Sequence, residues 1–153
     1  MGCGKDFDTG NCVCDILKEI AEAQNDVIEN CCDSSCEQSI HDLLGENDNG
    51  NGLDTVPVLL YCKGNCKPFK GYGACSRSTI SNIEGSFYFR VKKVTDDCCA
   101  ILELLRDHDD EDYDPHTPVT QYTGHLRATG ICITVDLNCF CHVTCLPAID
   151  AFN

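Results

Sequence analysis

The hydrophobic positions near the start of the chain follow a helical period. From Val13 to Cys31, apolar side chains recur every three or four residues, with acidic and amide side chains between them. This spacing places the apolar side chains on one face of a helix. We predict an amphipathic helix over about residues 12–30, with Asn11 as its N-cap and Asp15 in its first turn. A shorter helical turn is predicted over 40–44.

Beyond a turn-rich stretch at 46–52, the pattern changes to that of β-strands. Short runs rich in β-branched and aromatic residues are separated by turn residues. The runs are 56–62, 87–94, 99–105, 131–137 and 140–146, with weaker candidates at 68–72 and 119–127. Periodicity alone does not exclude a helix for 99–105. The pattern predicts a mainly β protein, with an antiparallel β-sandwich or jelly-roll-like core and one N-terminal amphipathic α-helix.

The length of 153 residues fits a single domain with a core large enough to fold without disulfides. We divide the chain into a flexible, cysteine-containing N-terminal arm (1–11), a helical segment (12–45) and a β-rich self-assembly core (53–150).

The charge balance restricts the classes of partner. Twenty-five acidic residues against 11 basic ones give a formal net charge of −14. A chain this acidic is a poor match for nucleic acid or anionic lipid, because both require a cationic face. The first residues contain no apolar segment of the secretory type, and no apolar run is long enough to span a membrane. We therefore expect synthesis in the cytoplasm without a signal peptide.

Cysteine is the unusual component of this chain. Fifteen cysteines occur in clusters, and because the number is odd, intrachain disulfides leave at least one thiol over. A reducing cytosol keeps thiols reduced, so this density conflicts with cytoplasmic synthesis. The conflict is resolved if the cysteines bind metal, stay free, or are oxidised later, after cell lysis.

Position along the chain separates two groups of cysteines. Cys3, Cys12 and Cys14 are the first candidates for intermolecular disulfides, because a chain terminus is mobile and can reach a neighbouring chain. The further candidates for intermolecular disulfides are Cys31, Cys32 and Cys36. The candidates for intramolecular disulfides or for the core are Cys62, Cys66, Cys75, Cys98, Cys99, Cys132, Cys139, Cys141 and Cys145.

Strand geometry refines the second group. Cys132 and one of Cys98 and Cys99 are expected to be buried as small apolar side chains. Adjacent residues of a strand face opposite ways, so Cys98 and Cys99 are expected to find different partners. Residues two apart face the same way, so Cys139 and Cys141 are expected side by side.

Zinc binding is the alternative use of these cysteines. Cys139, Cys141, His142 and Cys145 concentrate soft ligands in a short segment. The chain lacks the matched pair of knuckles that structural zinc sites prefer, so we predict no metal and no cofactor. An enzyme has no positive support either, because the sequence contains no Cys-x-x-Cys motif, nucleophile elbow, phosphate-binding loop or dinucleotide fingerprint.

The segment 106–114 carries six carboxylates between two predicted strands. Blocks of like charge repel one another and stay hydrated, so a solvated loop is predicted. Weak binding of divalent cations is the alternative.

Several segments resemble a known family. They are CGK and NCVCD before the first helix, DTVP at 54–57, FYFRV at 87–91, CCAIL at 98–102 and CITVDLNCFC at 132–141. In this order, and over nearly the whole chain, they resemble the spore coat protein Y/Z family of Bacillus and related spore formers, which includes exosporium proteins. The segment 132–141 is the most specific. The stretch after Cys141 and the three cysteines within 61–75 depart from the family pattern.

The resemblance implies a structural protein of the outer spore coat or exosporium, made in the mother cell cytoplasm. It implies self-assembly into cyclic homo-oligomers such as hexamers, which tile into flat ordered arrays hardened by disulfides. Other spore coat or exosporium proteins are the further partners that it implies. Lysis of the mother cell would supply the late oxidation that the cysteine content requires.

Overall fold

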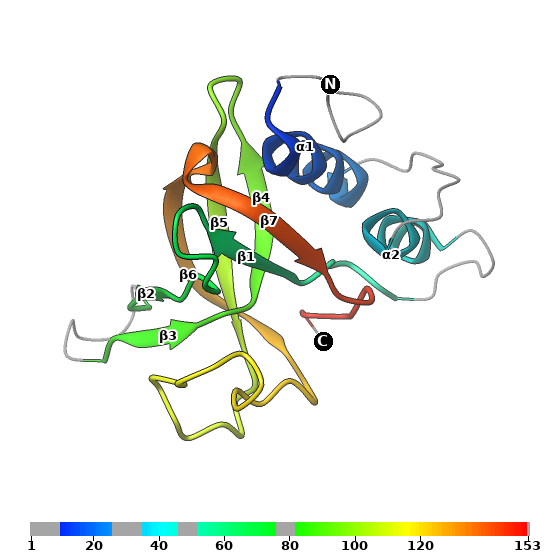
Figure 1. Ribbon diagram of the computed structural model, residues 1–153. Helices are drawn as coiled ribbons and strands as arrows, with labels where there is room; N and C mark the ends of the chain where they lie inside the picture. The colour runs from blue at the N-terminus through cyan, green and yellow to red at the C-terminus, as the bar shows by residue number, and fades with distance from the viewer. Residues whose placement is uncertain (1–9, 26–34, 46–51, 76–81, 153) are drawn as a thin grey trace.

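The computed structural model describes residues 10–25, 35–45, 52–75 and 82–152 (Figure 1). Within these ranges the chain forms two helices and seven strands. They are α1 (Cys12–Asn25), α2 (Ser35–Leu44), β1 (Val58–Cys62), β2 (Gly71–Gly73), β3 (Glu84–Ser86), β4 (Phe89–Val94), β5 (Cys99–Arg106), β6 (Arg127–Asp136) and β7 (Phe140–Cys145), with a 3-10 turn η1 (Leu137–Cys139) before β7.

The main element is a five-stranded antiparallel sheet in the order β6-β5-β4-β1-β7. β4, β5 and β6 follow one another as a meander, and β1 pairs with β4 on one side and with β7 on the other. β6 and β7 therefore form the two edges of the sheet. The mainly β, antiparallel prediction is confirmed, and so is each of the five main strand runs, with shifted ends.

The structure also resolves one ambiguous prediction and differs from two others. The ambiguous run 99–105 is strand β5, because both of its neighbours pair with it along most of its length. The weak candidate 119–127 is loop until β6 begins at Arg127, and β3 is a strand that the sequence pattern does not reveal. The second sheet, β2-β3, is small, so helices provide much of the second layer.

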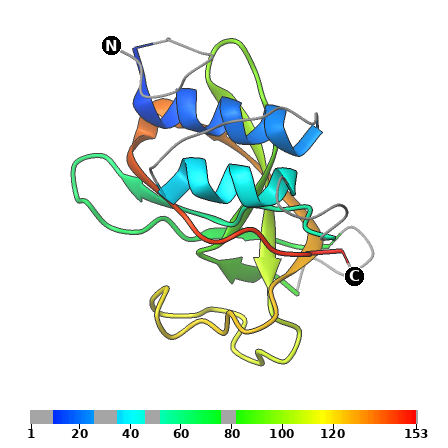
Figure 2. The ribbon, with the colours of Figure 1, turned by 90° about the vertical axis from the view of Figure 1, so that its right-hand side faces the viewer.

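Both helices lie side by side against the sheet, as Figure 2 shows. α1 buries Leu17 and Ile20 completely, and α2 buries Ile40 completely. These side chains join one apolar cluster with sheet residues such as Val91 and Leu102. Full burial of a side chain of this size stabilises a fold by roughly 1.5–3 kcal/mol, so the helix-to-sheet contact is the main core of the protein.

Hydrogen bonds fix both ends of α1. The Cys14 N–H donates to Asn11 Oδ1 at 3.0 Å, which confirms Asn11 as the N-cap. Near the other end, Gln24 Nε2 donates to the Val91 carbonyl at 2.6 Å, and Gln24 Oε1 accepts from the Val56 N–H at 3.1 Å. The predicted continuation of this helix to residue 30 lies outside the described residues. α2 is longer than the predicted turn at 40–44.

The small sheet packs directly on the main one. A Cβ atom on Gly71 would lie 2.7 Å from Ile133 Cδ1, and one on Gly73 would lie 2.5 Å from Ile131 Cγ2. Only glycine allows the β2 backbone to approach so closely. Ile131 and Ile133 lie in β6, so β2 covers the apolar face at this edge of the sheet.

A second, smaller apolar cluster contains Leu59, Phe87, Tyr88, Leu105, Leu126 and Ala151. It includes residues of the C-terminal segment, which is held by hydrogen bonds from Ala128 N–H to Ala151 O at 2.9 Å and from Ile149 N–H to Thr55 O at 2.8 Å. Neither described helix is long and apolar enough to cross a membrane.

Gly73→Ala is expected to destabilise the protein by about 1–3 kcal/mol, the usual cost of overpacking a core. The added methyl group would press on Ile131, which is 2% exposed and has little room to move. Urea unfolding measures the change. Gly124→Ala is the control, because its Cβ would meet only Asp107 Oδ2, at 3.9 Å. Equal stability of both variants would contradict the close approach of β2.

Candidate functional site

Two buried disulfides join the helices to the sheet. Cys14 of α1 is bonded to Cys98, before β5, and Cys36 of α2 is bonded to Cys145, at the end of β7. The Cα atoms are 5.8 and 4.8 Å apart, and the paired cysteines are separated by 84 and 109 residues. All four cysteines are buried. Each helix is therefore covalently fixed to the layer that it covers.

The structure differs here from the predicted roles of Cys14 and Cys36. Both are candidates for intermolecular disulfides in the sequence, yet both bond within the chain. The physical reason is helical periodicity, which places Cys14 on the same buried face as Leu17. Cys12 is also disulfide-bonded. Cys3, Cys31 and Cys32 lie outside the described residues.

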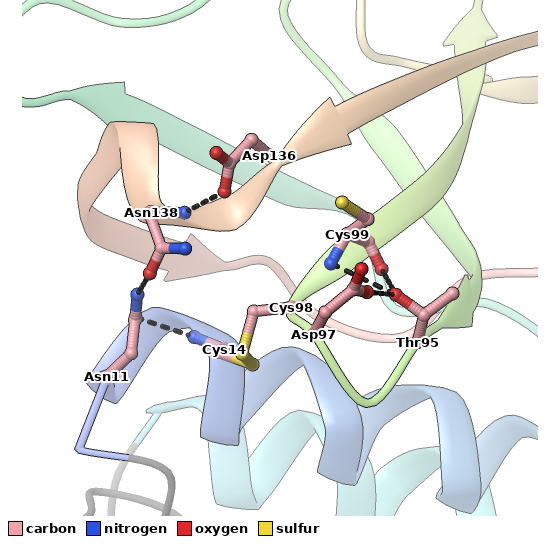
Figure 3. Close-up of a disulfide and its surroundings, with 8 residues drawn as sticks. All are labelled: Asn11, Cys14, Thr95, Asp97, Cys98, Cys99, Asp136 and Asn138. Carbon is pink, nitrogen blue, oxygen red and sulfur yellow. Dashed lines mark hydrogen bonds between the residues drawn. A yellow bond between two sulfur atoms is a disulfide. The ribbon is translucent and has the colours of Figure 1, made fainter.

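The adjacent residues Cys98 and Cys99 take opposite directions, as predicted (Figure 3). Cys98 has a φ of 63°, a left-handed turn conformation, and its side chain points to α1. Cys99 is a free thiol that opens β5 beside Asp97 and Asp136. Burial raises the pKa of Cys99, and the charges of these two carboxylates raise it further.

Seven of the described cysteines are free thiols. They are Cys62, Cys66, Cys75, Cys99, Cys132, Cys139 and Cys141. Four of them, Cys66, Cys132, Cys139 and Cys141, are exposed, and the other three are half-buried. The two helix-to-sheet disulfides thus lie in the interior and the free thiols toward the surface.

Four free thiols gather where β1 ends and β7 begins. In the β1–β7 ladder, Cys62 is paired with Phe140, which is the residue between Cys139 and Cys141 in the sequence. The Cys141 thiol donates to the Cys62 carbonyl with a sulfur–oxygen distance of 3.6 Å. Burial raises the pKa of Cys62, and the nearby thiols of Cys139 and Cys141 raise it further.

The turn after β1 carries the fourth of these thiols. The Cys62 N–H donates to the Lys67 carbonyl at 2.9 Å, which closes the turn that contains Cys66. The Lys63 N–H donates to the Cys139 carbonyl at 2.8 Å, which joins this turn to η1. We call Cys62, Cys66, Cys139 and Cys141 the thiol end of the sheet.

The predicted burial of Cys132 is wrong. Cys132 is exposed, and Lys92 Nζ lies 3.9 Å from its sulfur. β6 is an edge strand whose alternate residues face the core and the solvent, and Ile131 takes the core side. The sequence carries this signal, because Ile131, Ile133 and Val135 alternate with Thr134 and Asp136 and so put Cys132 on the polar side of the strand.

The alternative zinc ligands are not brought together. Cys145 is bonded to Cys36, and the His142 ring packs on Tyr61 with 4.7 Å between centroids. Among the residues that the structure describes, no group of three or more histidine, cysteine or acidic side chains is arranged to hold a metal ion.

The acidic segment 106–114 is more ordered than the predicted solvated loop. Arg106, Asp107 and Asp110 are buried. Arg106 donates to the carbonyls of Gly85 at 2.5 Å and Asp112 at 2.8 Å, and it forms an ion pair with Glu84 at 3.2 Å.

The two buried carboxylates of this segment hold a neighbouring stretch of chain. Asp107 Oδ2 accepts from the His125 N–H at 3.0 Å, and Asp110 Oδ2 accepts from the Tyr122 N–H at 3.1 Å. His108, Asp109, Glu111 and Asp112 are exposed. The prediction of a solvated block therefore applies only to part of the segment.

Comparison with known proteins gives one consistent result. A family model described as spore coat protein Z matches residues 1–148. Spore coat protein Z of Bacillus subtilis (strain 168) is 27% identical over 149 residues, which cover 90% of this chain and 90% of that protein. No solved structure gives a significant match.

Replacing both Cys36 and Cys145 by alanine is expected to reduce the free energy of unfolding by about 2–5 kcal/mol, since this disulfide closes a long loop. Denaturant unfolding under non-reducing conditions checks the value. Cys132→Ser, at an exposed free thiol, is the control and should change stability by no more than about 0.5 kcal/mol. A double variant as stable as the unmodified chain would show that the disulfide adds nothing to the fold.

Arg106→Met is expected to reduce stability by at least about 2 kcal/mol, because it leaves buried carbonyls without their donor. Limited proteolysis should then cleave within 107–114 sooner than in the unmodified chain. Lys93→Met removes a positive charge from an exposed position and serves as the control. Unchanged cleavage in the Arg106 variant would mean that the loop is ordered by other contacts.

Proposed function

Because the chain belongs to the spore coat protein Z family, we propose that it is a structural protein of the spore coat or exosporium that assembles with copies of itself into ordered two-dimensional arrays. Disulfides between copies then cross-link the arrays into a resistant shell. Cyclic homo-oligomers such as hexamers are the assembly unit, and other coat or exosporium proteins are further partners.

The observation that carries this proposal is the division of the cysteines. Cys14–Cys98 and Cys36–Cys145 stabilise the subunit from within, while seven free thiols of the described residues lie at or near its surface. A rigid subunit with accessible thiols suits cross-linking, because a thiol that an assembled lattice holds beside its partner reacts at a high effective concentration. Assembly would therefore come first and oxidation second.

The edges of the sheet support the same proposal. β6 and β7 each pair with a neighbour on one side only, and both carry exposed free thiols, Cys132 in β6 and Cys141 in β7. An unpaired edge offers backbone donors and acceptors to another chain.

The redox requirement supports the proposed place of synthesis. In a mother cell, the protein is made without export and stays reduced, and lysis then exposes it to oxidising conditions. We propose no metal and no catalytic step for this function.

Electron microscopy of the purified full chain, with and without reductant, tests the proposal. Sheets or closed rings should form in both conditions, because non-covalent contacts set the geometry. Reductant should lower the temperature at which they dissociate, and the oxidised sample should run as covalent oligomers in denaturing, non-reducing electrophoresis. Oxidised protein that runs as a single subunit and forms no ordered assemblies at high concentration would refute the proposed function.

A further inference from the structure

We propose that the thiol end binds an acidic face of a second copy of the chain and forms interchain disulfides with thiols outside that copy's own thiol end. This inference rests on the proposed function and specifies which surfaces meet. It follows from the position, the charge and the free thiols of this part of the sheet.

The thiol end lies in segments of the chain that have a net positive charge. Segments 58–75 and 137–149 form it and its surroundings, and they contain three lysines and no aspartate or glutamate. Lys63 and Lys67 are exposed beside Cys66, whereas Lys70 is paired with Asp114. These two segments therefore carry a net positive charge within a chain whose net charge is −14.

The charge distribution selects one mode of contact between copies. Two thiol ends repel each other, as do two acidic faces, but a thiol end attracts an acidic face. Where a copy offers its thiol end to one neighbour and its acidic face to another, the contact is heterologous, and heterologous contacts close into rings or continue into open assemblies.

The acidic face consists of the exposed carboxylates Asp96, Asp97 and Asp136, and it carries the free thiol Cys99 at the start of β5. Cys132 is a separate free thiol on the solvent side of β6, beside Lys92. In the β5–β6 ladder, Cys99 is opposite Asp136, four residues along β6 from Cys132. Four residues of strand span about 13 Å, which exceeds the reach of a disulfide, so these two thiols cannot bond to each other within one chain.

The thiols of the thiol end are also placed to react outward. Cys66, Cys139 and Cys141 are exposed, and the turn that holds Cys66 has its base fixed by the backbone bond to Cys139. β7 is an edge strand, so a second chain can approach it without displacing any strand. The buried disulfides Cys14–Cys98 and Cys36–Cys145 are shielded from exchange with these thiols.

The chemical step is a two-electron oxidation. One thiol from each copy loses a proton and an electron, and a sulfur–sulfur bond forms between them. A low-molecular-weight disulfide is the oxidant, and its own sulfur–sulfur bond is reduced to two thiols. The thiolate is the attacking species, so the raised pKa values of Cys62 and Cys99 favour slow reaction at neutral pH and faster reaction at higher pH.

The experiment maps interchain disulfides in the full-length protein. Unlabelled chains and chains labelled with nitrogen-15 are mixed while reduced, allowed to assemble and oxidised with a low-molecular-weight disulfide. Peptide pairs that join one labelled and one unlabelled chain identify interchain bonds by mass spectrometry. We expect unlike pairs, with one cysteine from the thiol end and the other from outside it, above all Cys99 of the acidic face.

A matched pair of charge variants tests the proposed attraction between the thiol end and the acidic face. Lys67→Glu should slow interchain cross-linking about tenfold or more at low salt, and the difference should shrink as salt screens the charges. Lys93→Glu changes the net charge by the same amount at an exposed site of β4 and should have little effect. Equal rates for the two variants would overturn the proposal.

The outcomes separate this inference from the proposed function. Ordered arrays whose interchain bonds join two thiol ends, or involve no cysteine of the thiol end, would overturn the inference and leave the proposed function standing. The absence of both arrays and interchain bonds would refute both. Circular dichroism and the stability of each variant confirm that a changed rate does not come from loss of the fold.

Discussion

The packing of two amphipathic helices on one face of the sheet is the interaction on which the rest of the structure depends. The helices supply Leu17, Ile20 and Ile40 to the core, all of them inaccessible to solvent. Short helices are marginal in water by themselves, so most of their stability must come from this tertiary contact. The sheet in turn needs a cover for its apolar face, and the small β2-β3 sheet covers only part of it.

The same packing decides which cysteines bond to each other. Once α1 presents one face to the sheet, Cys14 is carried into the interior beside the turn that contains Cys98. α2 similarly brings Cys36 to the end of β7. The pairing in these two disulfides is thus a consequence of the fold, and seven described cysteines outside these contacts stay free.

The sequence allows the classes of element to be predicted well, because periodicity reports burial directly. The first helix, its Asn11 cap and the five main strands follow from patterns of 3.6 and 2 residues. The opposite directions of Cys98 and Cys99 follow from the same rule. Strand β3 has only three residues, two of them glycine and serine, so no pattern of apolar residues marks it.

Predictions fail where the outcome depends on a distant segment. Cys14 belongs to a helical stripe, but only the three-dimensional fold shows that its partner lies 84 residues away. Cys132 is an exception, because the local alternation of Ile131 and Ile133 with Thr134 already places it on the solvent side of β6. The convergence of Cys62, Cys139 and Cys141 depends on the pairing of β1 with β7, which sequence position alone does not reveal. Arg106 opens a highly charged stretch of sequence, although it is buried and bound to backbone carbonyls.

In the proposed assembly, the distribution of charge would allow so acidic a protein to approach another copy of itself. Uniformly distributed charge of −14 would keep copies apart at low ionic strength. The lysines of segment 58–75 would give one part of the surface an attraction for an acidic part of another copy. Because that part also carries four free thiols, the proposed contact would bring together the groups that oxidation joins. Order would then be set by reversible contacts, and covalent bonds would preserve an arrangement already reached.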